Sequence, residues 1–211
     1  MDKKDKIYLG MTLIEMMVAI AIFTLGIAGF TLLFSKTWQT NSYTLEMGQS
    51  TMVVSQGVNT MVDYIRRSRQ GDDGSYPVVS ADDNDLVLYS DYNKDGVTER
   101  LHFYKSGQSV LMGVTNPTNT MPKTYPAGDQ KVVAIAGHIV NNSSTPFFYY
   151  YDNSYSGGTG QNPLDTPATV SDIRLVKVYL QININPNRAP DNIQMQSFAE
   201  LRNLNDYNQI Q

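Results

Sequence analysis

The sequence contains no cysteine, two histidines and one tryptophan in 211 residues. Without cysteine, disulfide bonds, thiol nucleophiles and thiolate metal sites are all excluded. The motifs His-Glu-x-x-His and Gly-x-Ser-x-Gly are also missing, as is a glycine-rich phosphate loop. His102 and His138 each lie in a strand-like segment, where a structural role is the simpler interpretation. We therefore expect a protein that is not an enzyme.

Charge is nearly absent from residues 11–34, an apolar run in which Glu15 is the only ionisable residue. As a helix this run is roughly 36 Å long, enough to cross a bilayer whose hydrocarbon core is about 30 Å thick. A carboxylate in the centre of such a helix costs roughly 2.5 to 3.5 kcal/mol on insertion scales. Glu15 therefore needs a specific partner.

The two ends of the run carry the residues expected on either side of a membrane. A polar leader, residues 1–10, precedes the run and contains three lysines, which place this end in the cytoplasm. Lys36 and Trp38 follow the run, where a snorkelling ammonium and an amphipathic ring are typical of the membrane interface. We expect the remainder of the chain to be exported.

The junction Gly10-Met11-Thr12-Leu13-Ile14-Glu15 resembles the prepilin processing signature of type IV pilins and type II secretion pseudopilins. The resemblance implies that a membrane aspartyl protease, the prepilin peptidase, cuts after Gly10 and methylates the new amino terminus at Met11. It also implies that Glu15, at the fifth mature position, is the assembly glutamate. The family usually has phenylalanine at the first mature position, and Met11 keeps its bulk and apolarity.

A physical reason supports this role of Glu15. Cleavage leaves a positive amino terminus on Met11 at the edge of the hydrocarbon, and Glu15 can neutralise the same terminus on a neighbouring subunit. Glu15 would then set the axial register of a filament. The alternative is an ordinary signal peptide cut after Ala28, with Gly26 and Ala28 as the small residues. That alternative leaves a carboxylate unexplained inside the apolar core of the signal.

Helical patterning continues beyond the membrane run. Apolar residues recur at spacings of four, three and four at Val54, Val58, Met61 and Ile65, and Gln49, Gln56, Asn59 and Asp63 fill the opposite side. Arginines at 66, 67 and 69 precede Gly71, a favourable charge placement for a helix end, where we expect solvated charge rather than a DNA or lipid site. The predicted helix covers residues 11 to about 69.

After Gly71 the sequence changes to short alternating segments between clusters of Gly, Pro, Asn and Asp. Segment 173–185 is the clearest strand, and its expected antiparallel partner is 193–201, joined through 185–192. The other expected strands are 86–89, 97–104, 109–114, 131–136 and the aromatic segment 146–151. Segments 116–128 and 152–167 are expected loops.

The sequence thus predicts an α+β fold in which one long amino-terminal helix packs its second half on an antiparallel β-sheet. The pilin resemblance implies the same layout. We expect a leader at 1–10, a membrane-spanning assembly half of the helix at 11–34, an amphipathic half at 35–70 and an exported β-rich domain at 71–211. The 86–104 hairpin and the closing segment 199–204 resemble W-type minor pilins and J-type minor pseudopilins.

One segment has the pattern of a metal site. Oxygen ligands at alternate positions followed by Gly96 match the first half of a calcium loop, with candidate ligands Asp91, Asn93, Asp95 and Glu99. Candidate contributors from outside the loop are Asp82, Asp83 and Asp85. His102 stands where an EF-hand has its bidentate glutamate, and the flanks are strand-like. The alternative is a hairpin whose Asp-Gly turn needs these residues for its backbone conformation.

These features predict a minor pilin or minor pseudopilin of a type IV pilus or a type II secretion-like filament. Its expected partners are other pilins or pseudopilins, the prepilin peptidase, an inner-membrane assembly platform and, before assembly, membrane lipid. Loss of the leader shifts the formal net charge from -4 to -5, because three lysines and two aspartates leave. The acidic balance argues against nucleic-acid binding. The alternative function is a membrane-anchored exported binding or hydrolytic domain.

Overall fold

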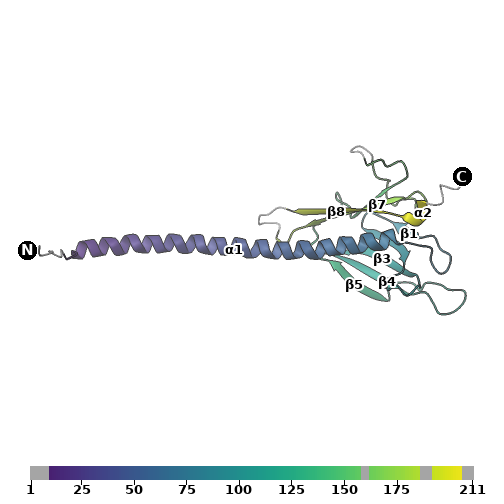
Figure 1. The fold of residues 1–211 in the computed structure, drawn as a ribbon, viewed down its shortest axis with the longest axis horizontal. Coiled ribbons are helices and arrows are strands. Elements are labelled where there is room, and N and C mark those ends of the chain that lie inside the picture. Colours follow the sequence, from purple (N-terminus) through teal and green to yellow (C-terminus); the bar gives the residue numbers. More distant parts are fainter. Residues whose placement is uncertain (1–9, 158–161, 186–191, 206–211) are drawn as a thin grey trace, which may run out of the picture. The chain divides into compact units, whose positions relative to one another are not determined.

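The computed structural model describes residues 10–157, 162–185 and 192–205 (Figure 1). The chain divides into two compact units, Met1–Glu46 and Met47–Gln211. The helix α1 (Leu13–Arg66) contributes to both, so the boundary falls within it. The second unit therefore begins inside the helix.

The first unit consists of the amino-terminal part of α1. Its large apolar side chains from Met11 to Trp38 are exposed, and α1 contains one stretch that is long and apolar enough to cross a membrane, none of it buried. The hydroxyls of Thr24 and Thr31 donate to the carbonyls of Ile20 and Ile27, both at 2.8 Å. These polar side chains are therefore satisfied within the helix and do not need water.

The second unit contains the rest of α1, which is amphipathic as predicted. The predicted apolar stripe is buried, with exposed fractions of 3% or less at Val54, Val58, Met61 and Ile65. The predicted polar side is exposed at Gln49, Gln56, Asn59 and Asp63. The helix ends at Arg66, three residues earlier than expected, and the chain then turns toward the first sheet.

Five strands form an antiparallel sheet in the order β1-β2-β3-β4-β5. They are β1 (Val78–Ala81), β2 (Asp85–Ser90), β3 (Glu99–Ser106), β4 (Ser109–Thr115) and β5 (Lys131–Ala136). The predicted hairpin is β2 with β3, in which Leu86 pairs with Phe103 and Leu88 with Leu101. All four of these side chains are buried. Strand β1 was not predicted, because it is a short segment after Pro77 with a bulge in its pairing.

Three further strands form a second antiparallel sheet in the order β6-β7-β8. They are β6 (Phe148–Tyr151), β7 (Leu175–Ile182) and β8 (Ile193–Glu200), followed by the short helix α2 (Arg202–Asn205). The predicted pairing of the last two strands is confirmed over the whole length of β7, from Leu175 opposite Glu200 to Ile182 opposite Ile193. Part of their predicted connection, 186–191, lies outside the described residues.

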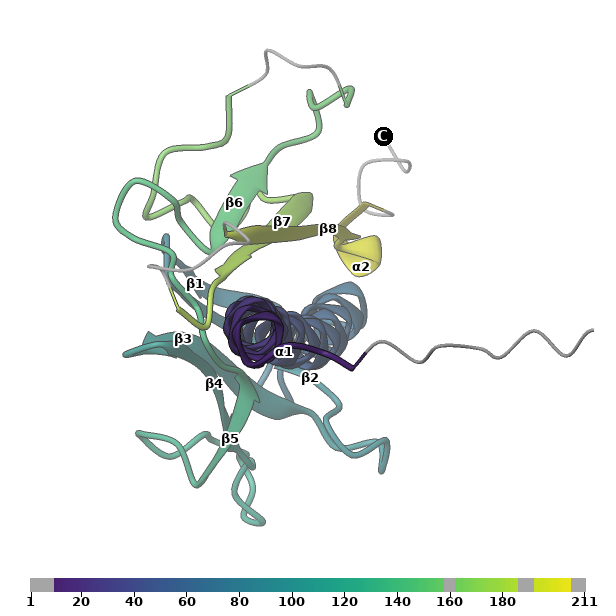
Figure 2. The ribbon, with the colours of Figure 1, turned by 90° about the vertical axis from the view of Figure 1, so that its left-hand side faces the viewer.

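The core lies between the two sheets. One cluster of buried side chains joins residues 54–65 of α1 to the inner faces of both sheets, and Figure 2 shows the sheets on either side of this helix. The expectation of a single sheet was therefore wrong in this respect: the apolar stripe is wide enough to be covered from two sides. The aromatic segment is buried as expected, with Phe147, Phe148 and Tyr150 at 1% exposure or less.

Gly57 allows α1 to approach the first sheet closely. A Cβ at this position would lie 2.7 Å from the carbonyl oxygen of Ile135 and 2.8 Å from its Cγ2. Ile135 is the unpaired residue of a bulge, because Val110 pairs with Ala136 and Leu111 with Ala134. The helix and β5 therefore meet backbone to backbone, which only glycine permits here.

Candidate functional sites

The start of α1 is closed by a hydrogen-bonded pair. Glu15 Oε2 accepts the backbone N–H and the hydroxyl of Thr12, both at 2.8 Å, and the Glu15 N–H is 3.3 Å from Thr12 Oγ1. Thr12 immediately precedes the helix and Glu15 is its third residue, so the two form a capping box. The Thr-x-x-Glu spacing was visible in the sequence. The contact was not predicted, because the expected partner of Glu15 was the amino terminus of another subunit.

The surroundings of Glu15 are apolar. A shallow groove along the helix is lined by Met11, Ile14, Glu15, Val18, Ala19 and Ile22. Both hydrogen bonds from Thr12 go to Oε2, and a carboxylate has room for about four acceptor contacts. The geometry therefore leaves Glu15 able to accept a further donor, such as an amino terminus, while it caps its own helix.

The predicted cleavage bond is open to solvent. Gly10 is exposed, no atom lies within 4 Å of the place where its Cβ would be, and Met11 is 64% exposed. Both residues precede the first helical residue, Leu13, so the bond between them is outside the hydrogen-bonded helix. A protease can reach such a bond without unwinding α1. Residues 1–9 of the predicted leader lie outside the described residues.

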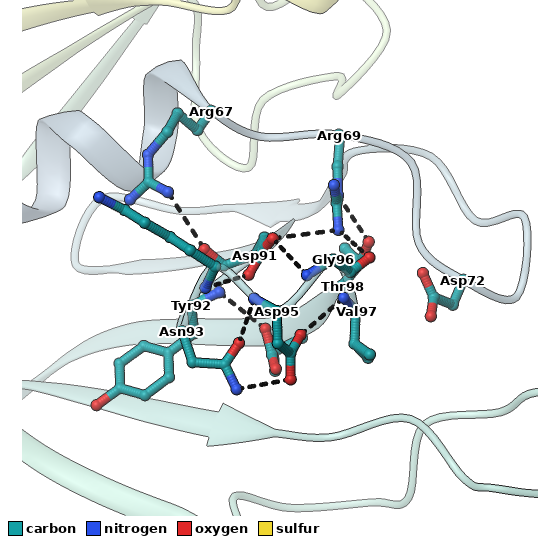
Figure 3. A network of polar contacts seen from close by, with 12 residues as sticks. Arg67, Arg69, Asp72, Asp91, Tyr92, Asn93, Asp95, Gly96, Val97 and Thr98 are labelled. Carbon is teal, nitrogen blue, oxygen red and sulfur yellow. Dashed lines mark hydrogen bonds and ion pairs between the residues drawn. The ribbon is translucent and has the colours of Figure 1, made fainter.

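The candidate calcium loop follows β2 and is shown in Figure 3. The two carboxylate oxygens of Asp91 accept the N–H groups of Lys94 and Gly96, at 2.6 and 3.1 Å. Asp95 Oδ1 accepts the Val97 N–H at 2.8 Å, which holds the pKa of Asp95 below its usual value. The side-chain oxygens of the loop therefore bind its own backbone, as a tight turn requires.

Arg67 and Arg69, which follow the end of α1, bind the same loop (Figure 3). Arg69 Nε donates to Thr98 Oγ1 and its Nη2 to the Gly96 carbonyl, each at 2.8 Å, and Nη2 is 3.7 Å from Asp91 Oδ2. Arg67 Nη1 donates to the carbonyl of Asp91 at 3.3 Å. The arginines that the sequence suggested were simply solvated thus fasten the loop and bring positive charge to it.

Glu99, the fourth candidate ligand, opens β3 and is only 1% exposed. Its Oε2 accepts the Tyr92 N–H at 2.8 Å, and burial raises the pKa of Glu99. Among the residues that the structure describes, no group of three or more acidic or histidine side chains is placed to hold a metal ion.

The other candidate contributors lie elsewhere. Asp82, Asp83 and Asp85 are at the opposite end of β2 from Asp91, about 20 Å along the strand, and cannot complete the loop. His102, in β3, is bound instead by Asp85 and Asp129. His138 is not in a strand: it has a positive φ of 58° just before an isolated bridge at Ile139.

No protein-family model, curated protein or solved structure matches this chain. Membership of the pilin and pseudopilin family therefore stays a prediction from the segment 10–15. What the structure adds is one exposed apolar helix with a capped carboxylate near its start, followed by an α+β unit with two antiparallel sheets.

Proposed function

We propose that the protein is a structural subunit of a type IV pilus or type II secretion-like filament, and specifically a minor pilin or minor pseudopilin. The observation that carries the proposal is Glu15, the lone carboxylate of the exposed apolar run 11–34, five residues after a glycine that precedes an accessible bond. Prepilin peptidase would cut this bond and methylate Met11. The protein then acts by assembling, and not by catalysing a reaction.

The exposed apolar surface of α1 supports this proposal. Side chains such as Leu13, Phe23 and Leu32 are 70 to 79% exposed, a contiguous surface that a soluble protein would not leave in water. Lipid covers it before assembly, in a single-pass orientation with the leader in the cytoplasm and the β-rich unit exported. Helices of neighbouring subunits cover it in the filament.

Glu15 has two roles in this proposal. Within the subunit it caps α1 through Thr12, which lowers the cost of carrying a carboxylate in hydrocarbon. Between subunits it attracts the positive amino terminus of a neighbour's Met11, an interaction strengthened by the low dielectric of the surroundings. The first role needs only an acceptor, whereas the second needs a negative charge.

Two substitutions separate these roles. Glu15→Gln keeps an oxygen that can accept the Thr12 N–H but removes the charge, whereas Glu15→Ala removes both. We expect leader cleavage and membrane insertion to persist in both variants, and incorporation into filaments to fall several-fold in both. Incorporation is measured as the amount of this protein in sheared filaments or in pull-downs with partner pilins. Glu46→Gln, an exposed carboxylate on the same helix, is the matched control.

Each outcome has a distinct meaning. If incorporation falls in Glu15→Ala but not in Glu15→Gln, Glu15 acts only as a helix cap, and the proposed register contact is wrong. If both variants assemble like the wild type, the filament role of Glu15 is wrong, and an anchored exported domain becomes the better description. Unchanged incorporation of Glu46→Gln is needed for either conclusion to stand.

A further inference from the structure

His102 in β3 lies between two carboxylates that come from distant parts of the chain. Its Nε2 is 2.7 Å from Oδ2 of Asp85, the first residue of β2, and its Nδ1 is 3.1 Å from Oδ2 of Asp129, just before β5. The ring of Tyr104, two residues along β3, stacks on the imidazole with a centroid distance of 4.5 Å. Both ring nitrogens therefore face an acceptor.

Gly113 makes room for this arrangement. It is the register partner of His102 on β4, and a Cβ there would lie 2.1 Å from Cγ of Asp129. The carboxylate of Asp129 thus fills the space that any side chain at 113 would occupy. Because Gly113 has no side chain, β4 brings no charged group to the ring at this position, and Asp85 and Asp129 are the charges that contact it.

Asp129 is the last residue but one of the segment 116–130, which has other attachments. Arg100 Nη2 donates to the carbonyls of Pro126 and Gly128, at 2.9 and 2.8 Å. Earlier in the segment, Lys123 pairs with Asp72, and the Tyr125 hydroxyl donates to the Thr98 carbonyl, both at 2.6 Å. The contact with His102 therefore fixes only the carboxyl end of the segment, where the chain enters β5.

We infer that Asp85, His102 and Asp129 form a proton-dependent latch, which holds the end of segment 116–130 against β3 while His102 is protonated and releases Asp129 when it is neutral. An imidazolium donates a hydrogen bond from both nitrogens, whereas a neutral imidazole donates from one and presents a lone pair at the other. The shorter contact is to Asp85, so Asp129 is the carboxylate that separates.

The direction with pH follows from the two partners. The hydrogen bond with Asp85, assisted by the charges of Asp85 and Asp129, raises the pKa of His102 above its ordinary value of about 6.5, although partial burial opposes the shift. A raised folded-state pKa of a histidine stabilises the fold at low pH. The latch is closed below about pH 6.5 and opens as the pH rises through the raised pKa.

Opening the latch changes a cavity. Segment 116–130 forms one wall of a space of ≈ 520 Å³ whose other lining includes Asp95 and Glu99. In that wall, Gln130 Oε1 accepts both the backbone and side-chain N–H groups of Asn116, and the Gln130 N–H donates to the Val114 carbonyl at 3.0 Å. Because Gln130 directly follows Asp129, release loosens this wall first.

Hydrogen exchange of the full-length protein in detergent tests the latch. The amides of Asn116 and Gln130 report on the wall, and that of Tyr179, bonded to the Phe147 carbonyl in the second sheet, reports on the rest of the fold. After correction for intrinsic exchange, we expect protection at Asn116 and Gln130 to fall about tenfold or more between about pH 5.5 and pH 8.5. Protection at Tyr179 stays constant.

Three variants give the test its controls. His102→Gln should remove the pH response, because its side chain does not titrate. Gly113→Ala should expel Asp129 and give low protection at Gln130 at both pH values, with His102 intact. His138→Gln, which alters the other histidine, should keep the wild-type response.

Equal protection of the wild-type amides at both pH values would overturn the latch, and so would a pH response that survives in His102→Gln. A loss of protection that extends to Tyr179 would indicate unfolding of the whole unit and would equally reject a local latch. If Gly113→Ala does not fold, His102→Gln alone decides.

Discussion

Glu15 and Glu99 show how differently two carboxylates of the same chain are stabilised. Glu15 stands on an exposed helix and accepts two hydrogen bonds from one neighbour. Glu99 is 1% exposed and accepts the Tyr92 N–H, with the negative charges of Asp91 and Asp95 nearby. In the part of the chain that the structure describes, the guanidinium of Arg69 contacts the loop at Asp91, Gly96 and Thr98, and no ion pair joins it to Glu99. Glu99 is therefore a buried charge with weak compensation.

We predict that Glu99→Gln stabilises the protein at neutral pH. Burial raises the folded-state pKa of Glu99, so ionisation costs stability as the pH rises above the unfolded value of about 4.3. The amide oxygen can still accept the Tyr92 N–H, while the buried charge is removed. We expect a gain of roughly 1 kcal/mol, or about 3 °C in melting temperature, at pH 7 and no gain near about pH 3.

Thermal melts of the full-length protein in detergent measure this effect, with the exposed Glu46→Gln as control. A lower melting temperature of Glu99→Gln at pH 7 would contradict the prediction. The same melts in calcium and in chelator test the metal hypothesis, and we expect equal values because the loop oxygens already bind backbone N–H groups. A bound calcium ion would instead add roughly 2.7 kcal/mol at a hundredfold excess over Kd, lost in Glu99→Gln.

At the scale of elements, the packing of α1 on the first sheet depends on Gly57. The matched comparison is Gly48, another glycine of α1, around which no atom lies within 4 Å of a built Cβ. We predict that Gly57→Ala destabilises the protein by about 1 to 3 kcal/mol, because its methyl group would overlap Ile135. Gly48→Ala should stabilise it by up to about 1 kcal/mol through helix propensity alone.

Denaturant unfolding with a common m-value provides the measurement. Equal effects of the two substitutions would mean that the helix can move away from β5 without loss, and the close approach would then be unimportant.

Periodicity was sufficient to predict the elements that bury one face. The stripe from Val54 to Ile65 and the alternation of β7 each repeat long enough to define a face, and both are buried as expected. Strand β1 has only four residues, too few for an alternation of apolar and polar residues to be recognised, and its pairing is interrupted by a bulge. The division into two sheets was not predictable, because no local sequence signal states which strands share a sheet.

The same distinction applies to the sites. Thr12 and Glu15 are three residues apart, so their contact was available from spacing alone. Asp85, His102 and Asp129 meet only because the register of β2, β3 and β4 brings them together and Gly113 leaves space. Such a cluster depends on the register of distant strands, which hydrophobic patterning does not specify to a single residue.

For the whole molecule, processing is the first event that the proposed function requires. We predict that co-expression with a prepilin peptidase removes residues 1–10 and leaves an N-methylated Met11, because the bond after Gly10 is exposed and precedes the helix. Intact-mass and terminal-peptide spectrometry measure the product. A bulky residue in Gly10→Val should prevent the cut and serves as the negative control. A mature chain that begins at Gly29 would establish the signal-peptide alternative.

The contacts of α1 with the edge strands of the two sheets have a consequence for aggregation. Arg66 Nη2 donates to the carbonyl of Phe198 on β8, the last strand of its sheet, at 2.9 Å, and Gly57 brings the helix against the backbone of β5, the last strand of the other. Exposed edge strands can pair with strands from other chains and start aggregation. One helix here contacts the edge strand of each sheet, and at these two points it stands where the strand of another chain would have to add.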